Sequence, residues 1–334
     1  MEEKVKFAEL IIEQIIAADH LINKNNHLSS RLALILTDNA IELLLYKQVI
    51  LAFSHDILYK YNISPQFPLE TRTQITGSFI ELNKFVHTNL NLLSINEYES
   101  IKFCHELRNK AYHESILRED FINEISKEYF HLCCELLSRL LPDYSSLFEI
   151  NIEKTFHHYG KKDLSLTVQK LKTEMIRISQ NIETNPKNLA YAMSGNLKTR
   201  IGGIIANLNY FGSFSQNDSP ILSDETFNTL KWIQFYHEPK PQGVDKEDYE
   251  KLFDDYHPKI NKRQINLWIN KSEKIKDLSD VHDIIRHFNL IDADIESINK
   301  IADEAVRELD EYIDWEVEIR EDEYRMRKYG QNDG

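Results

Sequence analysis

The sequence predicts an all-α protein, and three observations support this. Gly and Pro, which break regular structure, number only 9 and 8 among 334 residues. The β-branched residues lie mostly at helical spacing rather than in alternating runs. Segments with an apolar period of three to four residues follow one another with few interruptions. A chain of this length is expected to form two compact units, each with a sizeable core.

Five helices are expected in the first part of the chain. The first spans 3–23, where apolar residues recur at helical spacing. The second begins at a cap formed by Ser29 or Ser30 and runs to about residue 61. Three more are expected at 70–92, 97–112 and 119–141, the last ending before Pro142. Five helices with short connections predict a bundle over residues 1–145.

The periodicity lapses over residues 146–163, which we interpret as a connection. Residues 164–334 are expected to form a second, mainly helical domain of unknown role that ends in a long helix. Ser279 is a candidate cap for this last region, and Ile291 to Tyr312 carry an apolar stripe with alternating spacings of four and three. Such a stripe is typical of a coiled coil, which could pack inside the chain or pair two copies.

The net charge of −14 argues against nucleic-acid binding by the whole surface. The charge is nevertheless uneven. Residues 153–200 hold nine Lys and Arg against four Asp and Glu, whereas residues 303–323 of the C-terminal helix hold eleven acidic residues against two Arg. The basic stretch is either a solvated helix face or a surface that contacts phosphates, with Lys161 and Lys162 as candidate contacts.

No apolar stretch approaches the ~20 residues of a membrane span, and the start Met1-Glu2-Glu3-Lys4 lacks the basic region of a signal peptide. The cysteines Cys104, Cys133 and Cys134 show neither a disulfide framework nor metal-ligand spacing. We therefore expect a cytoplasmic protein that does not enter a membrane and that needs neither a metal nor a cofactor.

The segment Arg108-Asn109-Lys110-Ala111-Tyr112-His113 places a permanent cation, a carboxamide and an imidazole within two helical turns. A guanidinium can hold a phosphate through two hydrogen bonds, and an imidazole can take and give a proton near neutral pH. Positions five apart on an ideal helix point ~140° apart. An irregular helix end, or a second copy related by a two-fold axis, is needed to bring Arg108 and His113 to one phosphate.

This R-N-x-x-x-H pattern inside a helical bundle resembles the signature of the HEPN superfamily of helical ribonucleases, over residues 1–145 only. The resemblance implies a metal-independent endoribonuclease that cleaves RNA through attack by the 2′-hydroxyl. It also implies a composite cleft shared by two domains, and because this chain carries one copy of the motif, a homodimer is expected. The implied biology is that of a toxin or anti-phage defence effector, with an antitoxin or other regulatory protein as a candidate partner.

In this interpretation His113 removes the 2′-hydroxyl proton, Arg108 holds the scissile phosphate, and Asn109 orients the substrate or Arg108. The resemblance also implies a supporting polar group on an earlier helix, for which Asp38, Asn39 and Glu42 are candidates. Glu42 lies on an apolar stretch, so pairing with Arg108 is expected to offset the cost of its burial.

Lys110, Lys161 and Lys162 are candidate RNA contacts. The alternative function is a catalytically silent helical module that binds a protein partner, in which Arg108 and His113 have a structural role.

Overall fold

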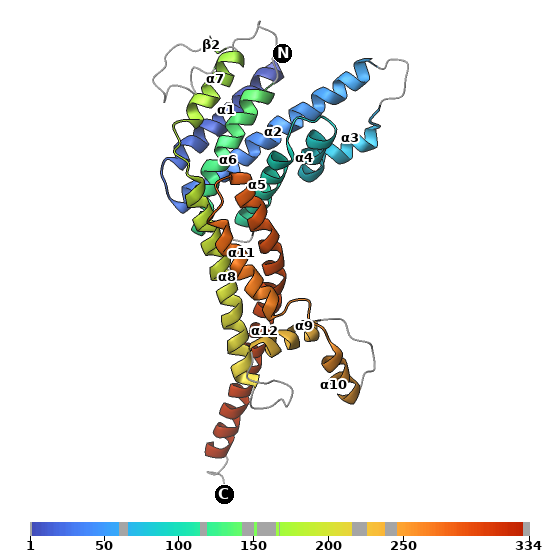
Figure 1. Cartoon of the computed structure of the whole chain (residues 1–334), viewed down its shortest axis with the longest axis vertical. Helices are drawn as coiled ribbons and strands as arrows, with labels where there is room; N and C mark the ends of the chain where they lie inside the picture. Colours follow the sequence, from blue (N-terminus) through green and yellow to red (C-terminus); the bar gives the residue numbers. More distant parts are fainter. Residues whose placement is uncertain are drawn as a thin grey trace. The chain divides into compact units, whose positions relative to one another are not determined.

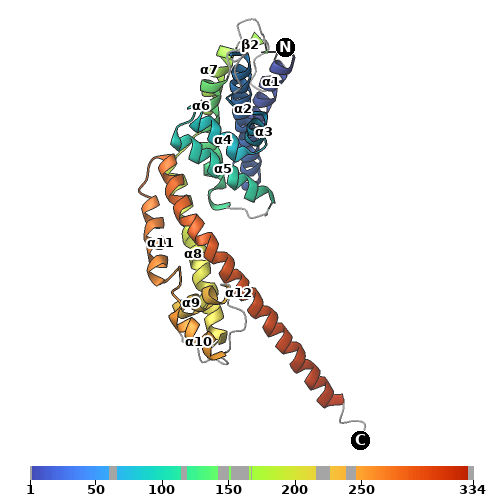
Figure 2. The same ribbon diagram turned by 90° about the vertical axis from the view of Figure 1, so that its right-hand side faces the viewer.

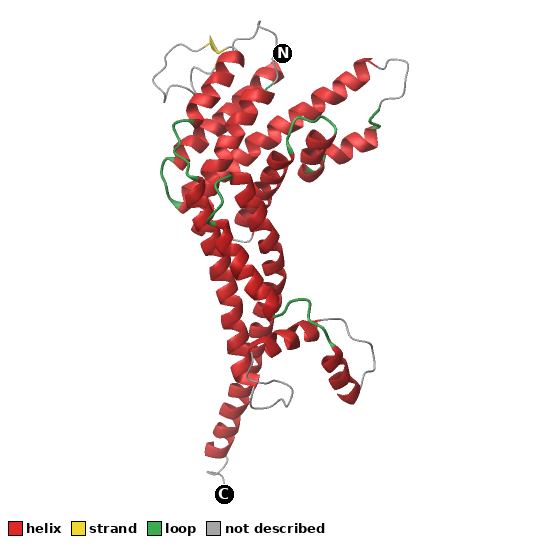
Figure 3. Cartoon of the chain, viewed as in Figure 1, coloured by secondary structure: helices red, strands yellow, loops and turns green. Residues whose placement is uncertain are grey.

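The computed structural model describes residues 2–59, 66–113, 119–141, 150–151, 165–166, 168–215, 226–237 and 246–329. These residues are helical apart from turns and one pair of two-residue strands, which confirms the predicted all-α class (Figure 3). The chain divides into two compact units, which are Met1–Met193 with Asp277–Arg286, and Ser194–Lys276 with His287–Gly334. Within the described part, no helix is both long enough and apolar enough to cross a bilayer.

The first unit, called unit 1, is a helical bundle. Its described elements are α1 (Glu2–Ile22), α2 (His27–Tyr59), α3 (Leu69–Thr76), α4 (Phe79–Thr88), α5 (Ile95–His113), α6 (Glu119–Leu140), the strands β1 (Ile150–Asn151) and β2 (Ser165–Leu166), and α7 (Val168–Ser179). The strands pair antiparallel, with Ile150 opposite Leu166.

Helix α2 is the centre of this bundle, because it contacts α1, α3, α4, α5 and α6, and its C-terminal part extends toward α3 (Figure 1). Its apolar face is fully buried at Ala33, Leu34, Ala40, Ile41, Leu44, Leu45 and Val49. Leu→Ala changes at such positions typically cost about 2 to 5 kcal/mol. The cysteines Cys104, Cys133 and Cys134 are also buried here, and none is in a disulfide.

Three helix boundaries differ from the predicted positions, and the local residues explain the differences. Helix α2 begins at His27 because Asn26 caps it: its Oδ1 accepts a hydrogen bond from the Ser29 amide at 3.0 Å. The predicted helix over 70–92 is two helices, broken at Gly77 and Ser78, where the Ser78 backbone is extended at φ −139°. The last helix is capped by Asp280 instead of Ser279, since Asp280 Oδ1 accepts from the Asp283 amide at 2.9 Å.

Unit 1 extends beyond the predicted bundle of 1–145. Helix α7 packs on α6, so residues C-terminal to the interpreted connection join the same core. Leu171, Met175 and Ile178 of α7 are buried. The division between the units therefore lies within α8 (Pro186–Ser215), whereas the sequence analysis placed it at 146–163.

The second unit, called unit 2, contains α8 from Ser194 onward, α9 (Thr226–His237), α10 (Lys246–Asp255), α11 (Lys262–Ile275) and the part of α12 (Val281–Tyr329) from His287 onward. Helices α8 and α12 lie side by side (Figure 2) and are joined by Arg200, which contacts Asp292 and, at 2.7 Å, Glu296. The apolar stripe of α12 is buried from Ile291 to Ala305, so this part of it packs inside the chain.

A cavity of about 400 Å³ opens in unit 1 among α5, α6, α7 and the first turn of α12. Glu128 of α6 lines it and is mostly buried. Burial raises the pKa of Glu128 from 4.5 to about 7, and the negative charge of Glu124 adds to the shift. Between these two pH values the folded chain holds a proton that the unfolded chain has lost, so this carboxyl lowers stability as pH rises through the window.

Replacing Glu128 should therefore stabilise the protein in a pH-dependent way. Glu128→Gln should leave the free energy of unfolding almost unchanged near pH 4 and raise it by up to about 3 kcal/mol near pH 8, at about 1.4 kcal/mol per pKa unit. Urea unfolding followed by circular dichroism at both pH values measures this. Glu106→Gln is the matched control, because Glu106 is 52% exposed, pairs with Lys102 at 4.0 Å and is not among the charges that shift the Glu128 pKa. A Glu128→Gln effect that is independent of pH would contradict the assignment.

Candidate active site

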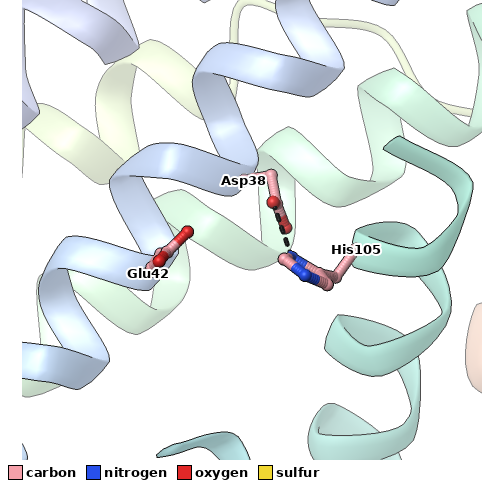
Figure 4. Close-up of side chains that lie close together, drawn as sticks. All are labelled: Asp38, Glu42 and His105. Carbon is pink, nitrogen blue, oxygen red and sulfur yellow. Dashed lines mark hydrogen bonds and ion pairs between the residues drawn. The ribbon is translucent and has the colours of Figure 1, made fainter. Parts of the chain in front are cut away.

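Three helices of unit 1 bring polar side chains together around Asp38. Helix α2 supplies Asp38 and Glu42, which are one turn apart and share a face. Helix α5 supplies His105, Arg108 and Asn109. Figure 4 shows Asp38 and Glu42 projecting from one helix toward His105 on the other.

Asp38 is the centre of this cluster, and its side chain has no exposed surface. Its Oδ1 accepts a hydrogen bond from the Tyr129 hydroxyl of α6 at 2.8 Å. Its Oδ2 accepts from Arg108 Nε at 2.8 Å and lies 2.9 Å from His105 Nδ1. An ionised carboxylate offers only lone pairs, so Nδ1 of His105 carries the proton in this contact. Three donors and one full positive charge thus compensate a charge that would otherwise be very costly to bury.

The charge of Asp38 also affects its neighbours. Burial raises the pKa of Tyr129 well above its usual range, and the Asp38 carboxylate raises it further. Burial and the same carboxylate raise the pKa of the Cys104 thiol. Tyr129 therefore stays a hydroxyl donor, and Cys104 stays a thiol rather than a nucleophilic thiolate.

Arg108 is held from three directions. Besides Nε on Asp38, its Nη2 donates to Glu42 Oε2 at 3.4 Å, and its Nη1 donates to Asn109 Oδ1 at 2.9 Å. The expected pairing of Glu42 with Arg108 is therefore present, although Glu42 is 44% exposed and the deeper counter-ion is Asp38. These contacts use three of the five guanidinium N–H groups, and 19% of the side chain remains exposed. Among the described residues, one N–H group on each terminal nitrogen has no hydrogen-bond partner.

The C-terminal end of the motif is held by α2. Helix α5 contains both Arg108 and His113, and His113 is its last residue. The side chain of His113 lies outside the described part. Arg31, which is seven residues before Asp38 and on the same face of α2, donates from Nη2 to the carbonyl oxygen of Ala111.

Sequence reasoning missed three members of the cluster, Arg31, His105 and Tyr129. The sequence could have identified His105, because it lies three residues before Arg108 and therefore on the same helix face. It could not have identified Tyr129, since Tyr129 is 91 residues from Asp38 and on another helix.

The candidate RNA contacts are only partly described. Lys110 lies on the last two turns of α5 and is partly exposed. Lys161 and Lys162 lie outside the described residues. Within the basic stretch, Arg177 pairs with Glu174 in unit 1, and Lys198 pairs with Glu273 in unit 2. Part of the positive charge in this stretch is therefore already compensated.

The cluster also has the ligand types of a metal site. The ligand atoms of Asp38, Glu42 and His105 all lie within 4.8 Å of one another. Carboxylate oxygen and imidazole nitrogen suit several divalent metals. Arg108, however, donates to both carboxylates. A metal ion could take this place only if the guanidinium withdrew from it.

Comparison of the chain with models of protein families, with curated proteins and with solved structures gives no significant match.

Removing the negative charge of Asp38 should destabilise the bundle strongly. In Asp38→Asn the side-chain shape is kept, but Arg108 loses its buried counter-ion, so the free energy of unfolding should fall by about 3 to 5 kcal/mol. Glu42→Gln is the matched control, since Glu42 is 44% exposed and its contact with Arg108 is longer, so its loss should cost about 1 kcal/mol or less. Urea unfolding followed by circular dichroism compares the two. Equal effects of the two changes would show that Asp38 is not the main counter-ion.

Proposed function

We propose that unit 1 is a metal-independent endoribonuclease of the HEPN type that acts as a toxin or anti-phage defence effector. The observation that carries the proposal is the state of Arg108. This motif residue is fixed by Asp38, Glu42 and Asn109, yet two of its terminal N–H groups have no partner among the described residues and 19% of its side chain is exposed. A guanidinium held in this way is suited to a phosphate, whose oxygens accept parallel hydrogen bonds.

The two ends of the guanidinium have different partners. Asp38 is fully buried and holds Nε at 2.8 Å, so this contact is a permanent anchor. Glu42 is much more exposed and holds Nη2 at 3.4 Å. A phosphate oxygen could replace Glu42 on Nη2 without disturbing Asp38. Anchoring one end of the arginine while leaving the other exchangeable reduces the entropy lost when a substrate binds.

In the proposed reaction His113 removes the proton from a ribose 2′-hydroxyl. The 2′-oxygen then forms a bond to phosphorus as the bond from phosphorus to the 5′-oxygen breaks, and the departing oxygen takes up a proton. The products are a 2′,3′-cyclic phosphate and a 5′-hydroxyl. Arg108 stabilises the charge that develops on the phosphate, and Asn109 keeps Arg108 oriented.

A homodimer is part of the proposal. Positions five apart on an ideal helix, such as those of Arg108 and His113 in α5, point ~140° apart. One phosphate is then most simply reached by Arg108 of one chain and His113 of a second chain related by a two-fold axis.

The alternative, a silent helical interaction module, is favoured by one feature. Each nitrogen of Arg108 already has a protein partner, as in a purely structural ion-pair network. The experiments below separate the two functions, because a structural network cuts no RNA.

The chemistry makes a direct prediction. Purified protein should cut single-stranded RNA in excess EDTA, because the proposed reaction uses only side chains of the chain. It should fail on a substrate with 2′-deoxyribose at the cleavage position, because the nucleophile is then missing. Gel analysis of labelled RNA and identification of the cyclic phosphate by mass spectrometry measure both results. Loss of cleavage in EDTA, or cleavage of the deoxy substrate, would refute the mechanism.

The shared cleft is tested by variants. Arg108→Lys keeps the charge near Asp38 but loses the planar fork, and His113→Ala removes the base, so each should lower the rate by about 10²-fold or more. A mixture of the two variants should regain part of the activity, because a mixed dimer contains one cleft with both native groups. Arg263→Lys and His20→Ala, at exposed positions, are the matched controls and should keep full activity. Sedimentation should show a dimer, and a fully active monomer would exclude the shared cleft.

A further inference from the structure

The cavity in unit 1 is a second candidate site, separate from the motif. It has a volume of about 400 Å³, within the usual range for small-ligand pockets. All of its lining residues belong to unit 1. They come from α5, α6, α7 and the first turn of α12.

The wall of this cavity combines an apolar surface with two acidic side chains. Ile125, Leu132 and Ile285 supply apolar surface. Glu128 is mostly buried, and it has no hydrogen bond or ion pair with any residue that the structure describes. Glu135, two turns along the same face of α6, adds a second carboxylate at the exposed edge. No Lys or Arg lines the cavity.

These features favour a positively charged ligand over a negatively charged one. An anion would face two carboxylates and no cation, which is unfavourable in a partly buried site. A cation would add an opposite charge beside Glu128, whose charge the neighbouring Lys127 offsets only in part. Burying a carboxylate is costly, so a bound cation would remove part of that cost.

A metal ion fits the cavity less well than an organic cation. Within the described residues, the carboxylate and imidazole groups that converge closely enough to hold a metal are those of Asp38, Glu42 and His105, and none of these lines the cavity. The two histidines of the cavity are already engaged, His131 with the carbonyl oxygen of Ile182 at 3.0 Å and His282 with the Ser100 hydroxyl at 2.7 Å. The apolar wall would instead bury a hydrocarbon body.

We propose that this cavity is a binding site for a small organic amine, with Glu128 as the counter-ion of the ammonium group and the apolar wall holding an aromatic or aliphatic body. The site is independent of the phosphate chemistry of Arg108, and binding can be measured without RNA.

A hydrogen bond connects a residue of the cavity wall to the motif. Tyr129 lines the cavity and also donates its hydroxyl to Asp38, the counter-ion of Arg108. A ligand that shifts Tyr129 would change the contacts that hold Arg108. Control of RNA cleavage by the amine follows from this link and rests on the proposed function.

Binding is tested by calorimetric titration of the full chain with phenethylamine and tryptamine as probes. Their neutral alcohol analogues, 2-phenylethanol and tryptophol, are the matched controls. The amines should bind with Kd near or below about 1 mM, and the alcohols about tenfold more weakly or worse, the ratio expected for one charge-assisted hydrogen bond. Glu128→Gln should weaken amine binding by about tenfold or more. Glu106→Gln, which changes an exposed acid outside the cavity, should not.

Three outcomes would overturn the site: no amine binding at about 10 mM, equal binding of amines and alcohols, or equal amine binding by Glu128→Gln and the native chain. Circular dichroism of Glu128→Gln confirms that the variant is folded. If the amines bind as expected but the protein cuts no RNA, the binding site stands and the proposed ribonuclease function fails.

Discussion

The buried carboxylate of Asp38 is the interaction on which the arrangement of unit 1 depends. Its oxygens accept hydrogen bonds from α5 and α6 at 2.8 to 2.9 Å while Asp38 itself belongs to α2. Sliding any of these helices by one turn would leave a charge in the core without its donors, at a cost of several kcal/mol. Apolar side chains alone tolerate such shifts better, because hydrophobic contacts have no direction. We infer that Asp38 fixes the register in which α5 and α6 pack on α2.

The same contact presents Arg108 at the surface of the bundle. A free arginine side chain has many rotamers, and ordering it on a ligand costs free energy. Here Nε is bound before any ligand arrives, and Asn109 holds Nη1. Glu42 competes with a ligand for Arg108, because Asp38 and Glu42 together carry more negative charge than Arg108 can neutralise. In the proposed function, a phosphate would have to displace Glu42 from Arg108 or bind beside it.

The sequence predicted the bodies of the helices better than their ends. Periodicity identifies a buried face, but the ends depend on single side chains such as Asn26 and Asp280, and on the break at Gly77. The partners of Arg108 were predictable because acidic residues on an apolar helix need a cation nearby. Tyr129 was not, because its contact with Asp38 exists only after α2 and α6 have packed. RNA cleavage and the homodimer stay predictions.

Tyr129 sets a limit on how strongly the cavity can control the motif. A ligand changes the state of a distant group only by the difference in free energy between its contacts in the two states. Among the described residues, the cavity wall is connected to the motif by the hydrogen bond from Tyr129 to the Asp38 carboxylate at 2.8 Å. A hydrogen bond to a charged group contributes about 1.5 to 3 kcal/mol, which corresponds to a factor of about ten to one hundred. An amine acting through Tyr129 could thus tune cleavage within this range. A complete on-off switch would require a larger rearrangement of α2, α5 and α6, and Asp38 opposes that rearrangement.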